Sequence, residues 1–145
     1  MTVEVARRTF RASPVKIAPG APTVMAMLEC YEPSRVAWRV LSRVADAFMT
    51  VDEEDAVAVM NRLARPGGSD PAIVAGESGG VGLAGLVRAA ADPEIRVALD
   101  LDAMSRVFVI NTEGATDLER YADLVGVRPE TVTAGAAFWA AGARA

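Results

Sequence analysis

The stretch AIVAGESGGVGL, residues 72–83, decides the fold that the sequence predicts. It starts with a short apolar run, Ala72–Ala75, and continues through a glycine-rich turn into a helix that we expect to begin at Ser78 and reach about Ala91. A short apolar run bounded by glycine is typical of a buried strand. Strand, turn and helix in this order indicate an α/β domain.

The same alternation continues on both sides of this stretch. Further strands are predicted at Thr2–Val5, Val15–Ile17, Phe48–Val51 and Arg106–Ile110. Helices are predicted with Pro33 as a first residue, after Asp52 as an N-cap, over Pro93–Leu99 and over Asp117–Val125, and a loop with a short helix over Ala18–Cys30. Strands separated by helices favour a parallel sheet that is covered on both faces. We therefore expect residues 1–145 to form one α/β domain with three layers (αβα) and a mostly parallel sheet.

Composition excludes several classes of function. A net charge of -4 and a pI near 4.9 disfavour nucleic acid as a partner, because nucleic-acid sites need basic patches. The chain contains no histidine, which removes the commonest general base and the commonest metal ligand. Helix capping explains the acidic run Asp52–Asp55, so no metal site is assigned.

Cys30 is the single cysteine, and it leaves no disulfide framework within the chain. An isolated cysteine beside apolar residues usually has a packing role. The longest apolar run, Ala134–Gly142, is about half of a membrane span, and the N-terminus has no apolar signal core. These features predict a cytoplasmic protein that does not bind membranes.

The run Gly80–Gly85 has the spacing G-x-G-x-x-G at the head of a predicted helix. This spacing alone suggests a dinucleotide site. However, residues 76–79 separate the strand from the first glycine, and no strand that ends in an acidic residue follows about twenty positions later. The alternative is a structural role, in which the glycines let the helix pack closely on the sheet, and we favour the structural role.

Two polar clusters follow two predicted strands directly. Glu77-Ser78-Gly79 comes after Ala72–Ala75, and Asn111-Thr112-Glu113-Gly114 comes after Arg106–Ile110. The carboxyl ends of parallel strands meet at one edge of a sheet, where α/β folds bind ligands. We therefore expect the two clusters to converge on one site.

The residues that carry these clusters resemble a known family. The segments 73–83 and 107–114 are similar to the diaminopropionate ammonia-lyases, of the threonine-dehydratase-like group of pyridoxal-phosphate enzymes (fold type II). The likeness extends upstream to Thr23–Cys30 and Glu32-Pro33, and downstream to about residue 126. It implies part of the large domain of the fold type II (tryptophan synthase β-like) fold.

The resemblance also implies roles for individual residues. Thr112 matches the residue whose hydroxyl hydrogen-bonds the pyridine nitrogen of pyridoxal 5'-phosphate, an arrangement that suits β-elimination. Glu77 matches a buried acid beside the ring, and Cys30 and Glu32 match residues that border the substrate entrance. The full set of implied cofactor-binding residues is Thr112, Glu77, Ser78, Gly79, Asn111, Glu113 and Gly114. No residue of the chain is assigned as catalytic.

The family's lysine that binds the cofactor covalently, and its glycine-rich phosphate loop, both belong to the part before the region matched here. The single lysine, Lys16, has no similarity to that lysine's surroundings. The chain also departs from the family at Met27, Tyr31 and Ala115, where the family usually has glycine, glycine and aspartate. These departures leave the amino-acid substrate open.

Three hypotheses follow from this incomplete match. In the first, the chain is the C-terminal component of a split β-eliminating ammonia-lyase acting on an amino acid such as 2,3-diaminopropionate, and a partner chain supplies the lysine and the phosphate loop. In the second, it is a degenerate lyase-like domain that serves as a binding or regulatory module. In the third, it is a fragment of a full-length lyase. An interrupted sheet leaves an open edge, so we expect association with the N-terminal lyase portion or self-association.

Overall fold

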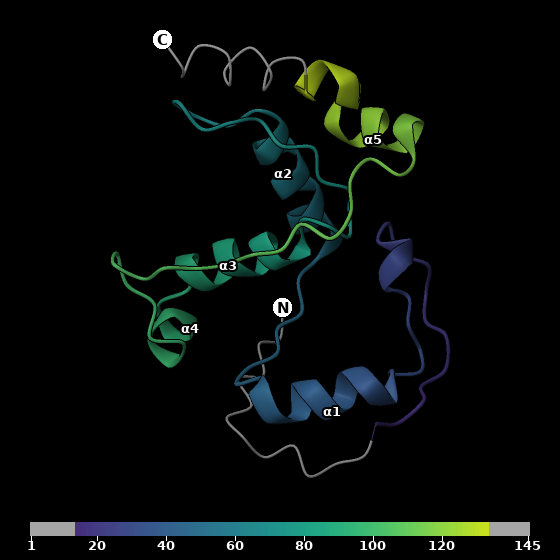
Figure 1. Cartoon of the computed structure of the whole chain (residues 1–145), viewed down its shortest axis with the longest axis vertical. Coiled ribbons are helices and arrows are strands. Elements are labelled where there is room, and N and C mark those ends of the chain that lie inside the picture. The colour runs from purple at the N-terminus through teal and green to yellow at the C-terminus, as the bar shows by residue number, and fades with distance from the viewer. Residues whose placement is uncertain (1–13, 134–145) are drawn as a thin grey trace.

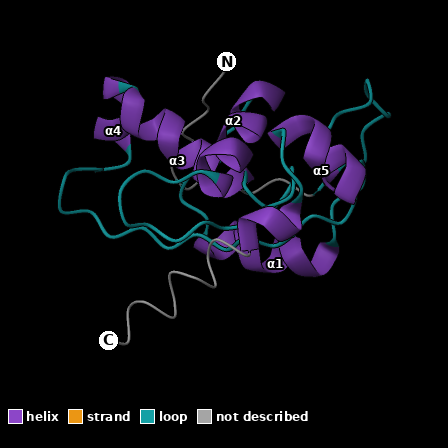
Figure 2. Ribbon diagram, turned by 90° about the horizontal axis from the view of Figure 1, so that it is seen from above, coloured by secondary structure: helices purple, strands orange, loops and turns teal. Residues whose placement is uncertain are grey.

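The computed structural model describes residues 14–133, and within this part the regular structure is entirely helical (Figures 1 and 2). Its helices are the short 3-10 helix η1 (Ala26–Leu28), α1 (Arg35–Val44), α2 (Glu53–Ala64), α3 (Val81–Ala91), α4 (Pro93–Ala98) and α5 (Leu118–Val125). No strand is assigned in the described residues. None of these helices is both long and apolar enough to cross a membrane.

The predicted αβα sheet is therefore wrong for the part of the chain that the structure describes. The runs predicted as strands at 15–17, 48–51, 72–75 and 106–110 are not strands, and Thr2–Val5 and Ala134–Gly142 lie outside the described residues. A strand needs a ladder of backbone hydrogen bonds to a neighbour. The run at 72–75 has only isolated bonds around it, such as the 2.8 Å bond from the Ile73 N–H to the Leu63 carbonyl.

The predicted helices are confirmed, with shifts at two starting points. Asp52 is the N-cap of α2 as predicted, and the Asp55 carboxylate accepts a 3.4 Å hydrogen bond from the Asp52 N–H. The helix expected from Pro33 begins at Arg35 instead, because the Ser34 hydroxyl caps it by accepting from the Ala37 N–H over 3.3 Å.

The helix expected from Ser78 begins at Val81. The amides of Gly79 and Gly80 both donate to the Gly76 carbonyl, over 3.1 and 3.3 Å, so residues 76–80 form a tight turn before α3. Ser78 lies inside this turn. At the other end α3 stops at Ala91 as predicted, and Asp92 caps α4 by accepting from the amides of Glu94 and Ile95.

The largest group of buried apolar side chains lies between α2 and α5. Met60 and Tyr121 are fully buried there, and Ala64, Val125 and Val132 complete the cluster. Side chains of α2 and of its C-cap residue also bond the C-terminal end of α5. The Asn61 amide donates to the Leu124 carbonyl over 3.1 Å, and the Arg65 guanidinium donates to the Val125 carbonyl over 2.6 Å. These bonds satisfy carbonyls that the end of a helix leaves unpaired.

Helix α3 packs against α2 through an ion pair and close glycine contacts. The Arg88 guanidinium lies 2.7 Å from the Asp55 carboxylate. This partner lowers the pKa of Asp55 by hydrogen bonding, and the pKa of Arg88 is raised in turn. By contrast, α1 buries none of its residues, and its apolar stripe of Val36, Val40, Leu41 and Val44 stays exposed.

Candidate functional site

The turn at residues 76–80 contacts the segment 111–114, so the structure brings the two predicted polar clusters together. The Gly76 N–H donates to the Glu113 carbonyl over 2.9 Å, and the Ser78 N–H donates to the Glu113 carboxylate over 3.3 Å. The Asn111 side-chain amide donates to the Val74 carbonyl over 3.1 Å. We call residues 76–80 and 111–114 together the paired-loop site.

Glycine is required for this close approach. A Cβ atom on Gly79 would overlap the side-chain oxygen of Asn111 and the backbone of Glu113. A Cβ atom on Gly76 would overlap the carbonyl of Gly114. Both glycines therefore let one backbone lie directly against the other.

The amides of the turn are already used inside the protein. Those of Gly76, Ser78, Gly79 and Gly80 all donate to oxygen atoms of the paired-loop site. Phosphate-binding loops present such amides to the ligand. The turn at residues 76–80 is therefore not a ready cradle for phosphate.

The glycines of the run Gly80–Gly85 permit close packing as predicted, but their neighbours among the described residues are α2 and irregular segments and not a sheet. A Cβ atom on Gly82 would lie 2.9 Å from Val109, and one on Gly80 would lie 3.1 Å from Val59. A Cβ atom on Gly85 would lie 3.5 Å from the sulfur atom of Met49. These glycines let α3 and its first turn approach α2 and the segments around residues 49 and 109.

Two hydroxyl groups of the paired-loop site differ in their exposure. Ser78 is 7% exposed, and its Oγ is buried without a hydrogen-bond partner among the described residues. A buried hydroxyl without a partner is costly, so this oxygen is suited to a bound polar group. Thr112 is exposed and its side chain is accessible.

Arg120 of α5 connects the paired-loop site to the loop before α1. Its Nε lies 3.5 Å from a carboxylate oxygen of Glu77, and its Nη2 donates to the Val24 carbonyl over 3.3 Å. The Val24 N–H in turn donates to the Glu53 carboxylate over 2.8 Å. The hydroxyl of Thr23, then this amide, and more weakly Arg120, lower the pKa of Glu53.

Cys30 and Glu32 lie on the exposed loop between η1 and α1. Cys30 is solvent-exposed, so its expected packing role is wrong. The Glu32 carboxylate lies 3.3 Å from the Lys16 ammonium group, and both side chains are exposed. No hydrogen bond or ion pair within residues 14–133 joins Cys30 or Glu32 to the paired-loop site, and their role at a substrate entrance stays a prediction.

Arg120 and Glu53 were not predicted from the sequence as parts of this arrangement. Arg120 stands among polar residues at the start of a helix and reads as a solvated charge. Glu53 reads as a first-turn acid that complements the helix dipole. Arg120 is 96 residues from Val24 in the sequence, and Glu53 is 29 residues from it. Because these contacts join distant parts of the sequence, no local pattern predicts them.

Known proteins are similar to this chain in sequence and in backbone structure. The sequence profile of the family described as pyridoxal-phosphate dependent enzyme matches residues 2–113. The diaminopropionate ammonia-lyase of Escherichia coli (strain K12) is 37% identical over 116 residues, which cover 77% of this chain and 29% of that protein. The diaminopropionate ammonia-lyase of Salmonella typhimurium (strain LT2) is 33% identical over 71% of this chain and 26% of its own length.

The solved structures give the same relation. The crystal structure of the Escherichia coli enzyme in complex with an aminoacrylate-PLP azomethine reaction intermediate superimposes with a TM-score of 0.67, at 37% identity over 72% of this chain and 28% of that one. The apo form of that enzyme matches with a TM-score of 0.60. The chain thus spans less than a third of the length of these relatives.

Proposed function

Because this chain belongs to the family of pyridoxal-phosphate dependent enzymes, we propose that it is the C-terminal component of a split ammonia-lyase that acts on an amino acid such as 2,3-diaminopropionate. It would contribute the side of the cofactor site that faces the pyridine ring. A second polypeptide would contribute the covalent lysine and the phosphate loop. The observation that carries this proposal is the pairing of two family-like motifs through Gly76, Ser78 and Glu113.

The chemistry of the paired-loop site suits a neutral ring better than a phosphate. Its hydroxyls are that of Ser78, which is buried without a partner among the described residues, and that of Thr112, which is exposed, and a hydroxyl can hydrogen-bond a heteroaromatic nitrogen or oxygen. Its charges are the carboxylates of Glu77 and Glu113, and the nearby cation Arg120 is already paired with Glu77. Two carboxylates repel a phosphate dianion, so the phosphate would be bound by the second polypeptide.

Lys16 does not supply the missing amine. Its ammonium group lies on the exposed loop region and is paired with Glu32 over 3.3 Å. Bound pyridoxal phosphate supplies an electron sink for elimination. In our proposal the Thr112 hydroxyl would hydrogen-bond the ring nitrogen of the bound cofactor. Glu77 would hold the turn through Arg120, and the buried Ser78 hydroxyl would find its partner on the cofactor.

One observation favours a second function, that of a degenerate lyase-like module. Tyr31, which stands where the family usually has glycine, donates its hydroxyl to the Glu29 carboxylate over 3.1 Å. Burial, and then this acidic partner, raise the pKa of Tyr31. In this second function, the Tyr31 side chain, which is held in the loop by its bond to Glu29, would narrow the region that the family resemblance assigns to the substrate entrance.

The test is to purify the chain from its native source together with any associated polypeptide. We expect the complex to show the visible absorbance of enzyme-bound pyridoxal phosphate and to release ammonia from 2,3-diaminopropionate. Loss of a single hydrogen bond to the ring, worth about 1–1.5 kcal/mol, should make Thr112→Ala about tenfold slower in turnover. Thr131→Ala, at another exposed threonine, serves as the matched control.

The two functions predict different results for these variants. A complex without bound cofactor, with partner binding unaffected by Thr112→Ala, would overturn the lyase proposal and favour the binding module. A slower Thr112→Ala enzyme with unchanged Thr131→Ala activity would support it.

A further inference from the structure

The segment Arg106–Ile110 has an unpaired backbone and apolar side chains in solvent. Within residues 14–133, none of its five residues forms a hydrogen bond. Val107, Phe108 and Ile110 are 50%, 87% and 63% exposed. Unpaired backbone groups beside apolar side chains form a template on which another strand can add.

The side chains of this segment divide between two faces. Val109 contacts Gly82 of α3, and Val107 lines a pocket beside α3, whereas Phe108 and Ile110 are the more exposed. Alternation with a period of two is the geometry of a strand. A segment that is apolar on both faces is typical of a strand buried inside a sheet that is covered on both sides.

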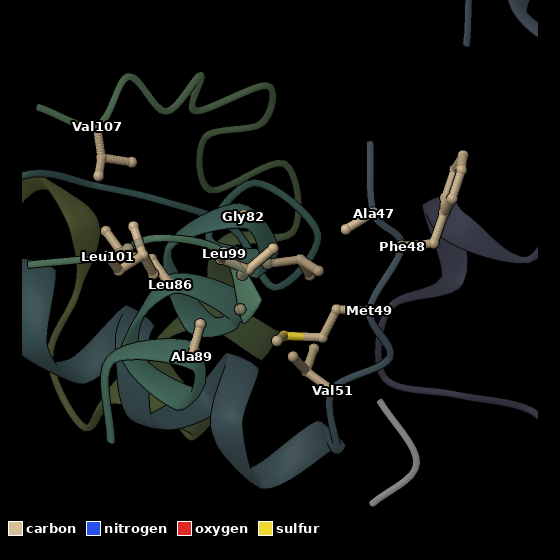
Figure 3. Close-up of a pocket in the computed structure, with 12 residues that line it drawn as sticks. Ala47, Phe48, Met49, Val51, Gly82, Leu86, Ala89, Leu99, Leu101 and Val107 are labelled. Carbon is tan, nitrogen blue, oxygen red and sulfur yellow. The ribbon is translucent and has the colours of Figure 1, made fainter. Parts of the chain in front are cut away.

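The pocket beside this segment is apolar and has a volume of about 390 Å³ (Figure 3). It lies between the segment 47–51, the glycine-bearing face of α3 and the chain after α4. Figure 3 shows Met49 and Val51 directed toward this face of α3, and Phe48 directed away from it. Among its other lining residues are Leu86, Leu99, Leu101 and Val107. Burying such an apolar surface is favourable, so it is suited to receive apolar side chains.

The comparison with the relatives indicates what covers this surface. The described backbone superimposes on the Escherichia coli lyase with a TM-score of 0.67, but it corresponds to only 28% of that chain. Within residues 14–133, no segment pairs with the backbone of Arg106–Ile110. A second copy of this chain would repeat the same part of the fold and leave the rest absent.

We infer that Arg106–Ile110 receives a β-strand from the polypeptide that carries the remaining part of the lyase fold, and that apolar side chains next to this strand fill the pocket lined by Met49, Leu86 and Val107. This inference rests on the proposed split lyase and names the surface through which its two components join. The bound strand would satisfy the backbone of residues 106–110. It would also fix Asn111 and Thr112, the next residues, against the turn at 76–80.

The test uses the full chain, tagged and expressed in its native source. Co-purified polypeptides are identified by mass spectrometry, and hydrogen exchange of residues 106–110 is compared in the free and bound chain. Phe108→Asp places a charge on the proposed interface and should lower recovery of the partner at least about tenfold, the equivalent of 1.4 kcal/mol. Met104→Asp is the matched control, because Met104 is 84% exposed and lies outside the segment.

The inference is supported if the recovered polypeptide has the sequence of the remaining lyase fold, the amides of 106–110 are protected only in the complex, and Phe108→Asp alone loses it. Recovery of no partner, of an unrelated protein, or of a homodimer protected at 106–110 overturns it. Hydrogen exchange of the wild-type complex decides the question even if Phe108→Asp fails to fold.

The same experiment separates this inference from the proposed function. If a complex binds cofactor and is catalytically active but the amides of residues 106–110 are unprotected, the proposed surface is overturned and the proposed function is not. A complex joined at 106–110 without cofactor overturns the function but not the surface.

Discussion

The backbone N–H of Ser78 donates to the side-chain carboxylate of Glu113 over 3.3 Å, and this bond joins two motifs that are 35 residues apart. The other oxygen of the same carboxylate accepts from the Thr116 hydroxyl over 3.1 Å. Glu113 thereby fixes the turn before α3 and the chain before α5 at one point. The order of the paired-loop site depends on this side chain.

We expect Glu113→Ala to lower the free energy of unfolding by about 1–2 kcal/mol, because it removes both acceptors and leaves the Ser78 amide unsatisfied. Urea unfolding of the two proteins measures the difference. Glu130→Ala is the control: its carboxylate lies 3.6 Å from Arg128 with both side chains exposed, and removing it should change stability by less than about 0.5 kcal/mol. Equal effects of the two substitutions would contradict the structural role of Glu113.

Gly79→Ala should destabilise the protein more strongly. The added Cβ would overlap the Asn111 side chain and the Glu113 backbone, and backbone atoms cannot move aside as a flexible side chain can. We expect a loss of about 3 kcal/mol, at the upper end of the cost of overpacking. Gly67→Ala tests the same change where the Cβ meets nothing within 4 Å, and should be nearly neutral. A stable Gly79→Ala protein would show that the two loops are not in close contact.

Helices were predictable from the sequence because their signals are local. Asp52 lies immediately before α2 and caps it, and Pro93 lies at the first residue of α4. Two starting points were misplaced for equally local reasons, since Ser34 and not Pro33 defines the start of α1, and the amides of the turn delay α3 to Val81. Local chemistry therefore fixes these helices to within a few residues.

Strands were not predictable in the same way, because a strand is defined by its partners. The run Arg106–Ile110 has the composition of a buried strand, but within the described residues its backbone has no neighbour to pair with. The meeting of the turn at 76–80 with 111–114 was nevertheless anticipated from the order of the two motifs. Arg120 was not, because its contacts with Glu77 and Val24 join parts of the sequence far apart.

The ion pair between Asp55 and Arg88 predicts a specific dependence of stability on pH. The guanidinium lowers the pKa of Asp55 below 3.8 in the folded protein, whereas the unfolded chain keeps the ordinary value. The unfolded state therefore binds the proton first, so the stabilisation is present above about pH 4 and is lost as the pH falls through the lowered pKa. Arg88→Gln should be less stable than wild type at neutral pH, and the difference should shrink on acidification.

Urea unfolding at a series of pH values from neutral to acid measures this difference. Arg128→Gln is the control, because the Arg128 pair with Glu130 is exposed on both sides. A stability gap for Arg88→Gln that stays constant down to strongly acidic pH would contradict the assigned origin of the shift.

Tyr121→Phe is expected to stabilise the protein. The Tyr121 ring is fully buried between α2 and α5, and its hydroxyl has no hydrogen-bond partner in the described residues. Removing an unsatisfied buried hydroxyl, with the ring kept, should raise the free energy of unfolding by about 1 kcal/mol.

The same substitution should also change how stability depends on alkaline pH. Burial raises the pKa of Tyr121 above its ordinary value of 10.0, so above that pH the Tyr121 hydroxyl of the unfolded chain releases its proton before that of the folded protein does. Wild type then loses stability that the phenylalanine variant keeps, and the gap between them should widen in alkaline solution. Thermal unfolding at neutral pH and at alkaline pH measures both effects, and a variant less stable than wild type at neutral pH would mean that the hydroxyl has a partner in the folded protein.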